Sequence, residues 1–330
     1  MQTIIKLTLA AAVILTSCSG VASKKENNVT VPEEPTVKFN ADSAYSFIKK
    51  QVDFGPRVPG SDSHARCADY LIDELKRHGI DTVYTQTGQM TAFNGDILPI
   101  KNIIGSINPE KNERVLIAAH YDTRPWADNE SDEEKSRQPI DGANDGASGA
   151  GVILELARIL AVNRPEIGVD FLLVDAEDYG NSSGVGSHED SWCLGTQYWC
   201  KNDIYTSQNR PKYGIVLDMV GGRDARFHRE YYSVRNAAKT VDKVWGAAAR
   251  AGFSSYFPNQ IGGALIDDHL FISRNGIPCI DIVECNNART GSFPATWHTH
   301  QDNMSNIDTA PLRAVGQTVL NVLLSEKGDK

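Results

Sequence analysis

The stretch RVLIAAHYD, residues 114–122, is a continuous apolar run that ends in His120, Tyr121 and Asp122. A short run that is apolar on both faces is typical of a strand buried inside a parallel sheet. The next segment, GASGAGVILELARILAV (146–162), has helical spacing and opens on small residues, and VDFLLVDAED (169–178) is a second buried run. A strand, a crossover helix and another strand predict an α/β fold with parallel strands.

The same alternation extends along the chain in both directions. Further helices are predicted over residues 43–55, 63–79, 237–252 and 307–326, and further strands over 102–107, 213–222 and 277–284. We find no internal repeat and no second linker. We therefore predict a single α/β domain over residues 41–327, in which a mostly parallel, twisted central sheet has helices on both faces.

The first 40 residues predict export rather than fold. Residues 1–18 contain Lys6, an apolar run from Leu7 to Leu15, and small residues before Cys18, which is the pattern of a secretory signal peptide. The ending LTSC resembles a bacterial lipobox, whose cysteine becomes lipidated; the alternative is an ordinary cleaved signal. Residues 19–40 are polar and contain proline, so they predict a flexible tether. Together these segments predict a periplasmic lipoprotein held in the cell envelope through Cys18.

The composition limits the partners of the domain. The formal net charge of −9 argues against binding nucleic acid, because contacts with phosphates need a basic surface. No segment beyond the N-terminus has the run of about 20 apolar residues that a membrane span requires. We therefore expect contact with the membrane only through the N-terminal lipid.

The cysteine count leaves the disulfide pairing open. Apart from Cys18 the chain has Cys67, Cys193, Cys200, Cys279 and Cys285, an odd number. Cys193 and Cys200 are close in sequence, but on one continuous helix they would be about 10 Å apart, which is too far for a bridge. They can pair only if Cys193 precedes the helix.

Acidic and imidazole side chains follow nearly every predicted strand. In open α/β sheets the active site lies at the carboxyl ends of the strands, so these side chains should face one cleft. The residues concerned are His120, Asp122, Asp145, Glu177, Asp178, Asp218, Asp267, Asp268, His269, His298 and His300.

Taken singly, these residues have ordinary explanations. An Asp before a helix is usually an N-cap, which would account for Asp145 or Asp268. An acidic pair after a strand is usually a solvated loop, which would account for Glu177 and Asp178. Taken together, carboxylates that converge on one cleft repel each other unless a cation or shared protons compensate. Oxygen and imidazole ligands together suit zinc, so we predict a zinc site with one open position.

The motifs AAHYDT, GANDGASG, DAED, VLDMVG, DDHLF and TWHTHQDN occur in the order, and at about the spacing, of the zinc aminopeptidase and glutaminyl cyclase superfamily. Within it, the sequence resembles the animal-type glutaminyl-peptide cyclotransferases of bacteria. That family converts N-terminal glutamine to pyroglutamate and releases ammonia. The resemblance implies one zinc ion per chain and N-terminal glutaminyl peptides as substrates. The predicted signal peptide and tether add exported proteins as expected substrates.

The resemblance also implies the ligands of the zinc. Asp145, Asp178 and His298 match the three ligands, and Glu177 matches the catalytic acid/base. The animal enzymes commonly have Glu where this chain has Asp178, which is shorter by one methylene, so the turn must lie closer to the metal. His300 is expected to be an outer or surface residue.

Four further residues are expected beside the metal. Asp218 and Asp267 match two acids that hydrogen-bond to each other. Trp297 matches an aromatic wall next to the ligand histidine. Trp192 is our candidate for a second wall, with a core tryptophan as the alternative.

A two-zinc aminopeptidase of the same superfamily is the alternative function. It would use His120 and Asp218 for a second metal, with Asp145 bridging the two ions. Two residues favour the cyclase. Asp267 stands where peptidase relatives typically have a small polar residue, and it would share a proton with Asp218 and impair a second metal site. Trp297 stands where they usually have Tyr or a small residue. A non-catalytic binding protein is a third class, which the presence of Glu177 disfavours.

Overall fold

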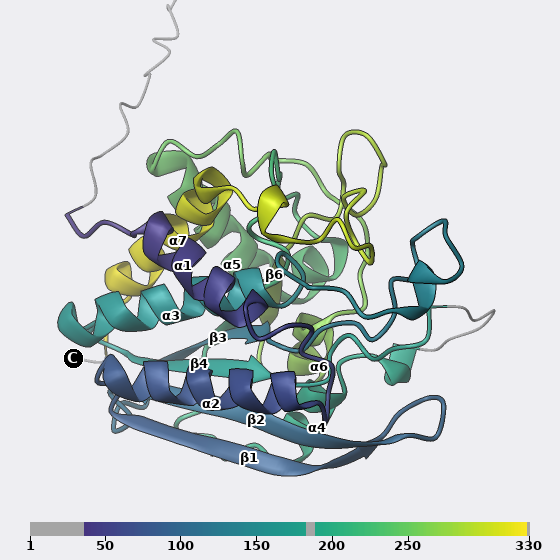
Figure 1. The fold of residues 1–330 in the computed structure, drawn as a ribbon. Coiled ribbons are helices and arrows are strands. Elements are labelled where there is room, and N and C mark those ends of the chain that lie inside the picture. The colour runs from purple at the N-terminus through teal and green to yellow at the C-terminus, as the bar shows by residue number, and fades with distance from the viewer. Residues whose placement is uncertain (1–35, 183–188, 329–330) are drawn as a thin grey trace, which may run out of the picture. The chain divides into compact units, whose positions relative to one another are not determined.

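The computed structural model describes residues 36–182 and 189–328. Its centre is a six-stranded sheet in the order β1-β2-β4-β3-β5-β6 (Figure 1). The strands are β1 (Thr82–Thr91), β2 (Ile97–Ile107), β3 (Arg114–His120), β4 (Gly168–Val174), β5 (Tyr213–Leu217) and β6 (Cys279–Ile282). β3 pairs in parallel with β4 and β5, and β5 pairs in parallel with β6. β2 pairs antiparallel with both β1 and β4. The prediction of a mostly parallel sheet is confirmed.

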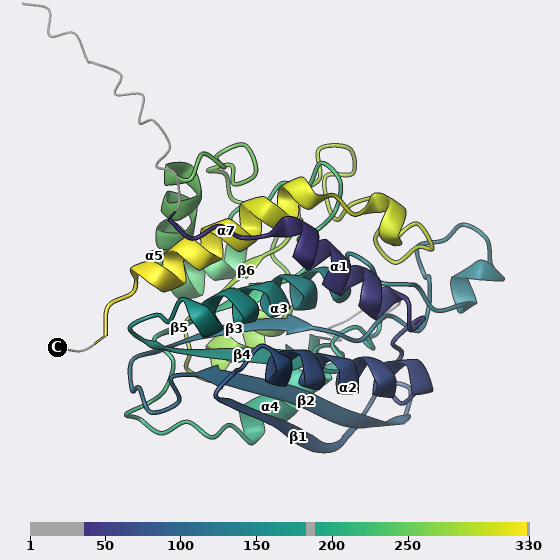
Figure 2. The same ribbon diagram turned by 60° about the vertical axis from the view of Figure 1, so that its left-hand side comes forward.

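Helices cover both faces of this sheet. They are α1 (Ala41–Val52), α2 (Asp62–Arg77), α3 (Ala147–Val162), α4 (Leu194–Lys201), α5 (Tyr231–Arg250), α6 (Asp268–Arg274) and α7 (Thr309–Ser325). Short 3-10 turns span Lys135–Arg137, Glu189–Ser191 and Met304–Asn306. Figures 1 and 2 show α2 and α3 along one face of the sheet, with α1 and α7 packed outside α3. Helix α4 lies on the opposite face.

The alternation of side chains along β3 explains this arrangement. Val115 and Ile117 belong to the larger core, which includes residues of α1, α2, α3, α5 and α7. Leu116 and Ala118 belong to a second core with Trp199 of α4 and Ile272 of α6. Successive residues of a strand point to opposite faces. A strand that is apolar at every position is therefore buried on both sides, as the sequence predicts.

The β1–β2 hairpin is not predicted from the sequence, apart from residues 102–107 in the last part of β2. The residues of β1, TVYTQTGQMT, are exposed or half-buried throughout the strand. An edge strand of this kind buries little apolar surface, so its sequence has no clear hydrophobic alternation. Its place is set by pairing with β2, from Thr82 opposite Ser106 to Thr91 opposite Ile97.

All five cysteines in the described part of the chain are free. Cys193 does precede α4, as a disulfide to Cys200 would require, but the two are not joined. Cys193 instead contacts Glu177, and the Cys200 thiol lies 3.6 Å from the carbonyl oxygen of Phe271. The predicted signal peptide and residues 19–35 of the predicted tether lie outside the described residues. None of the described helices is long and apolar enough to cross a membrane.

Candidate active site

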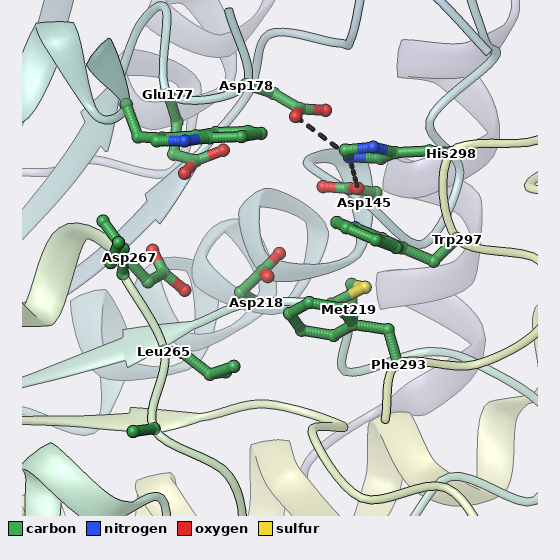
Figure 3. Close-up of a pocket in the computed structure, with 13 residues that line it drawn as sticks. Asp145, Glu177, Asp178, Asp218, Met219, Leu265, Asp267, Phe293, Trp297 and His298 are labelled. Carbon is green, nitrogen blue, oxygen red and sulfur yellow. Dashed lines mark ion pairs between the residues drawn. The ribbon is translucent and has the colours of Figure 1, made fainter. Parts of the chain in front are cut away.

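A pocket of about 270 Å³ lies at the carboxyl ends of the parallel strands (Figure 3). All eight residues predicted for the site line this pocket, together with five apolar residues from the segments around Asp218, Asp267 and Trp297. The lining residues are Asp145, Glu177, Asp178, Trp192, Asp218, Met219, Ala264, Leu265, Ile266, Asp267, Phe293, Trp297 and His298. The tertiary structure thus brings together side chains that are more than 150 positions apart in the sequence.

The turn before α3 positions Asp145. Gly146, the N-cap residue of α3, has φ = 93°, and a Cβ there would lie 2.4 Å from the carbonyl oxygen of Asp122. The buried carboxylate of Asp302 accepts hydrogen bonds from the backbone N–H groups of Asn144 (2.7 Å) and Asp145 (3.0 Å). Asp145 is therefore not the N-cap of the helix, and its own carboxylate is free to face the pocket.

The turn after β4 positions Glu177 and Asp178. The Asp122 carboxylate, which follows β3, accepts hydrogen bonds from the backbone N–H groups of Glu177 (3.1 Å) and Asp178 (3.2 Å). Glu177 is 8% exposed and Asp178 is 1% exposed. The interpretation of this acidic pair as a solvated loop is wrong, because a neighbouring strand end holds the turn in the interior.

Asp145, Asp178 and His298 form a group that suits a metal ion. His298 Nε2 lies 3.1 Å from Asp178 Oδ1 and 3.6 Å from Asp145 Oδ2, the two ion pairs drawn in Figure 3. One potential ligand atom from each residue lies within 4.8 Å of the other two, and all three residues are buried. Asp178 Oδ2 is buried without a hydrogen-bond partner in the described part of the chain. Two carboxylates and one imidazole facing an open pocket fit a zinc site with one position left for substrate.

His120 connects this group to Asp218. Its Nε2 lies 3.1 Å from Asp145 Oδ1 and 3.2 Å from Asp218 Oδ1. Burial alone would lower the pKa of His120, but the carboxylates of Asp122, Asp145 and Asp218 raise it well above its ordinary value. These three neighbours favour an imidazolium at this place. His120, Asp145 and Asp218 are nevertheless also close enough to hold a metal ion.

The acids on the far side of the pocket are suited to proton transfer. Burial raises the pKa of Glu177 well above its ordinary value, and burial raises the pKa of Asp218 to about 8. The Cys193 thiol donates a hydrogen bond to Glu177 Oε1 at 3.3 Å. A carboxyl group whose pKa is raised by burial can both accept and return a proton.

Asp218 Oδ1 lies 3.2 Å from Nε2 of His120. The hydrogen bond between Asp218 and Asp267 that the resemblance implies stays a prediction. Asp267 is the N-cap of α6 and accepts a hydrogen bond from the backbone N–H of Asp268. The N-cap role considered for Asp268 therefore belongs to its neighbour. Both acids still line the same pocket.

Aromatic rings enclose the pocket around His298. The Trp297 ring stacks on the His298 ring with their centroids 3.8 Å apart, and Phe293 packs 4.2 Å from Trp297. The Trp192 ring is stacked 6.4 Å from His298 on the pocket side, so its interpretation as a core tryptophan is wrong. His300 points elsewhere and pairs with Glu130 at 3.2 Å.

Backbone strain concentrates at this pocket. Ala176, Cys193, Met219 and His298 all have φ between 47° and 56°, in the left-handed region that residues other than glycine rarely adopt. Met219 and His298 line the pocket, Ala176 precedes Glu177, and Cys193 contacts Glu177. Such conformations persist only where surrounding contacts determine them, and they cluster at functional sites.

The residues that support the site are not among those predicted from the sequence. Asp302 lies within the quoted motif TWHTHQDN, but nothing in the motif indicates that it binds the turn of Asp145. Arg124 and Asp128 lie in the segment directly after β3. Arg124 donates a hydrogen bond to the carbonyl oxygen of Asp178, and the Asp128 carboxylate lies 3.0 Å from Nδ1 of His298. For Arg124 and Asp128, the sequence indicates a role near the site only by placing charged residues directly after a buried strand.

Comparisons with known proteins agree with this geometry. Residues 102–323 match the model of peptidase family M28. A crystal structure of Bacteroides thetaiotaomicron glutaminyl cyclase bound to N-acetylhistamine is 48% identical, with a TM-score of 0.84, over 88% of this chain and 99% of that chain. A Zn-dependent exopeptidase from Parabacteroides distasonis is also 48% identical, with a TM-score of 0.84 over 88% of this chain and 99% of that one. The glutaminyl-peptide cyclotransferase of Bos taurus is 22% identical over 82% of this chain and 78% of its own length.

We expect the loss of His298 to abolish tight zinc binding. The His298→Ala variant should bind zinc more than about 100-fold more weakly, since even an outer partner of a ligand contributes about 10- to 100-fold. The zinc dissociation constant, measured by competition with a chromophoric chelator, tests this. His300→Ala is the matched control and should bind zinc like the wild type. Equal zinc affinity in the two variants would remove His298 from the ligand set.

Proposed function

This chain belongs to peptidase family M28, and we infer that it is a glutaminyl-peptide cyclotransferase with zinc as its cofactor. It converts N-terminal glutamine of peptides and proteins to pyroglutamate and releases ammonia. The observation that carries this function is the 48% identity to a bacterial glutaminyl cyclase over 99% of that chain. All residues predicted for the reaction line one pocket.

The pocket explains how the substrate is held. Trp192, Trp297 and Phe293 provide apolar surfaces that can enclose the glutamine side chain and keep water away from it. The zinc ion, when bound, polarises the side-chain amide carbonyl of glutamine. The attacking group is the α-amine of the same residue. Holding both groups in a folded conformation therefore lowers the entropic barrier to reaction.

Glu177 moves the proton. The α-amine nitrogen forms a bond to the side-chain amide carbon, and the bond from that carbon to the amide nitrogen breaks. Glu177 accepts the proton that the amine loses and donates it to the departing nitrogen, which leaves as ammonia. The raised pKa of Glu177 suits this exchange, since a strongly acidic carboxyl would accept the proton poorly.

A glutamine-initiated peptide tests this reaction. We expect the zinc-loaded protein to release ammonia and to yield a product lighter by one ammonia with its chain otherwise intact, as mass spectrometry would show. Glu177→Gln should lower kcat by about 10²- to 10⁴-fold, the usual contribution of a general acid–base group. His300→Ala serves as the control with normal activity. A free amino acid and a shortened peptide would instead identify an aminopeptidase.

We also propose that each chain uses one zinc ion, held by Asp145, Asp178 and His298. The position of His120 supports this, because its Nε2 lies 3.1 Å from Asp145 Oδ1 and 3.2 Å from Asp218 Oδ1, so the imidazole already joins the two carboxylates that a second ion would need. The aminopeptidase alternative needs a second ion at His120, Asp145 and Asp218, whose potential ligand atoms also lie within 4.8 Å of one another.

Metal analysis distinguishes these two arrangements. After dialysis we expect one zinc per chain in the wild type, and the same value in His120→Asn, since that residue is not a ligand in our proposal. Two ions per chain in the wild type, reduced to one in His120→Asn, would contradict it. That result would favour a two-zinc peptidase.

The location and the substrates in the cell are proposals from the sequence. A lipid on Cys18 and a tether over residues 19–40 would hold the enzyme in the periplasm, where exported proteins present their N-termini. The net charge of −9 supports the exclusion of nucleic acid as a partner.

Cell fractionation tests the lipid anchor. We expect the full-length protein in the membrane fraction and the Cys18→Ser variant outside it, because a single substitution removes the lipid attachment site. An unchanged distribution of this variant would contradict the lipoprotein proposal. It would leave the enzymatic proposal untouched.

A further inference from the structure

Arg124 is a buried cation that the proposed reaction does not use. It lies in the segment after β3 and is 1% exposed. A buried guanidinium is stable only when its donors and its charge are paired. Its partners therefore indicate which parts of the structure depend on it.

The first partner is Asp128, which leads to His298. Arg124 binds the Asp128 carboxylate through two parallel hydrogen bonds, from Nε (3.0 Å) and from Nη2 (2.6 Å). Asp128 Oδ1 in turn lies 3.0 Å from Nδ1 of His298. This contact is an ion pair outside hydrogen-bond geometry, and a carboxylate so close to Nδ1 favours a proton on that nitrogen. The lone pair of Nε2 is then left for a metal, and Nε2 is the nitrogen that faces Asp145 and Asp178. Arg124 thus fixes the carboxylate that orients the imidazole.

The second partner is the turn that contains Asp178. Arg124 Nη1 donates hydrogen bonds to the carbonyl oxygens of Asp178 (2.8 Å) and Gly180 (3.0 Å). These bonds go to carbonyl groups of the turn, whereas Asp122 accepts hydrogen bonds from its N–H groups. The backbone of the second metal ligand is therefore held at both ends.

The third partner is the pocket wall. The Arg124 guanidinium carbon lies 4.8 Å from the centre of the Trp192 ring and 5.2 Å from that of Trp126. A guanidinium in this position attracts an aromatic face, and a buried contact of this kind is stronger than an exposed one. Trp192 thus has Arg124 behind it, while it contributes to the lining of the pocket.

We propose that Arg124 is a positioning residue that sets the His298 ring, the Asp178 turn and the Trp192 wall together. Arg124 and Asp128 carry opposite charges, so the pair adds no net charge to the site. Arg124 Nη1 also lies 3.6 Å from Asp178 Oδ1, and Arg124→Lys keeps that positive charge while it removes the fork geometry. Lysine cannot replace Arg124, because an ammonium group lacks the forked set of donors that binds a carboxylate and two carbonyls. It also lacks the planar face that stacks on tryptophan. The expected effect on KM rests on the proposed function, whereas the expected effect on zinc affinity does not.

The chain contains a matched control at the other end of β3. Arg114 is 3% exposed and binds Asp170 through Nε (2.7 Å) and Nη2 (2.5 Å). Its Nη1 also donates to backbone carbonyls, those of Asn108, Pro109 and Lys111. Arg114 therefore has the same kinds of bonds as Arg124, but at the end of the strand away from the pocket. Arg114→Lys disturbs a comparable buried pair without touching the proposed metal ligands.

The experiment compares Arg124→Lys with Arg114→Lys. We expect both variants to melt at a lower temperature than the wild type. Only Arg124→Lys should raise the zinc dissociation constant, by about 10- to 100-fold, which is the usual effect of losing an outer partner of a ligand. At saturating zinc, Arg124→Lys should also raise KM for a glutamine-initiated peptide, because Trp192 loses its support.

Asp128→Asn tests the His298 arm of the proposal by itself. It should weaken zinc binding, because the imidazole of His298 then no longer faces a carboxylate at Nδ1. Wild-type zinc affinity in Arg124→Lys, or an equal loss in Arg114→Lys, would overturn the proposal. Zinc affinity is measured without substrate. A protein that binds zinc as expected but releases no ammonia would therefore contradict the proposed function alone.

Discussion

The constraint on which this structure depends is the burial of many carboxylates at one edge of the sheet. Asp145, Glu177, Asp178, Asp218 and Asp267 line one pocket, and Asp122 and Asp302 lie buried behind it. In a low-dielectric interior these charges repel unless cations, protons or N–H donors compensate them. Each compensating group has a defined place, and those places determine the geometry of the site.

Backbone amides compensate the carboxylates that do no chemistry. Asp122 and Asp302 each accept two backbone N–H bonds, and in doing so they hold the turns of Glu177 and Asp145. The carboxylates that face the pocket have fewer such donors. They are instead close to His120, His298 and a potential cation, or they have a pKa raised by burial. Structural and reactive acids thus differ in their partners rather than in their residue type.

A fold of this kind does not by itself separate a cyclase from a peptidase. Both reactions need an electrophilic metal and an acid/base, and this chain has residues for both. The differences lie in the surroundings: the imidazole of His120 between Asp145 and Asp218, and the rings of Trp192, Trp297 and Phe293 around the pocket. The His120 imidazole lies between two carboxylates that a second ion would need, and the aromatic rings shield the pocket from water in a reaction whose nucleophile belongs to the substrate.

The sequence by itself determined the βαβ core, the mostly parallel sheet and the eight residues expected in the pocket. Buried strands have an apolar run that is visible in any window, and strand ends in α/β folds converge on one edge. Only the tertiary structure decided the β1–β2 hairpin, the burial of Glu177 and Asp178, and the supporting roles of Arg124, Asp128 and Asp302. An edge strand buries too little apolar surface to leave a pattern. A supporting contact depends on distances between segments, such as the 3.0 Å from Asp128 to His298, which no local spacing encodes.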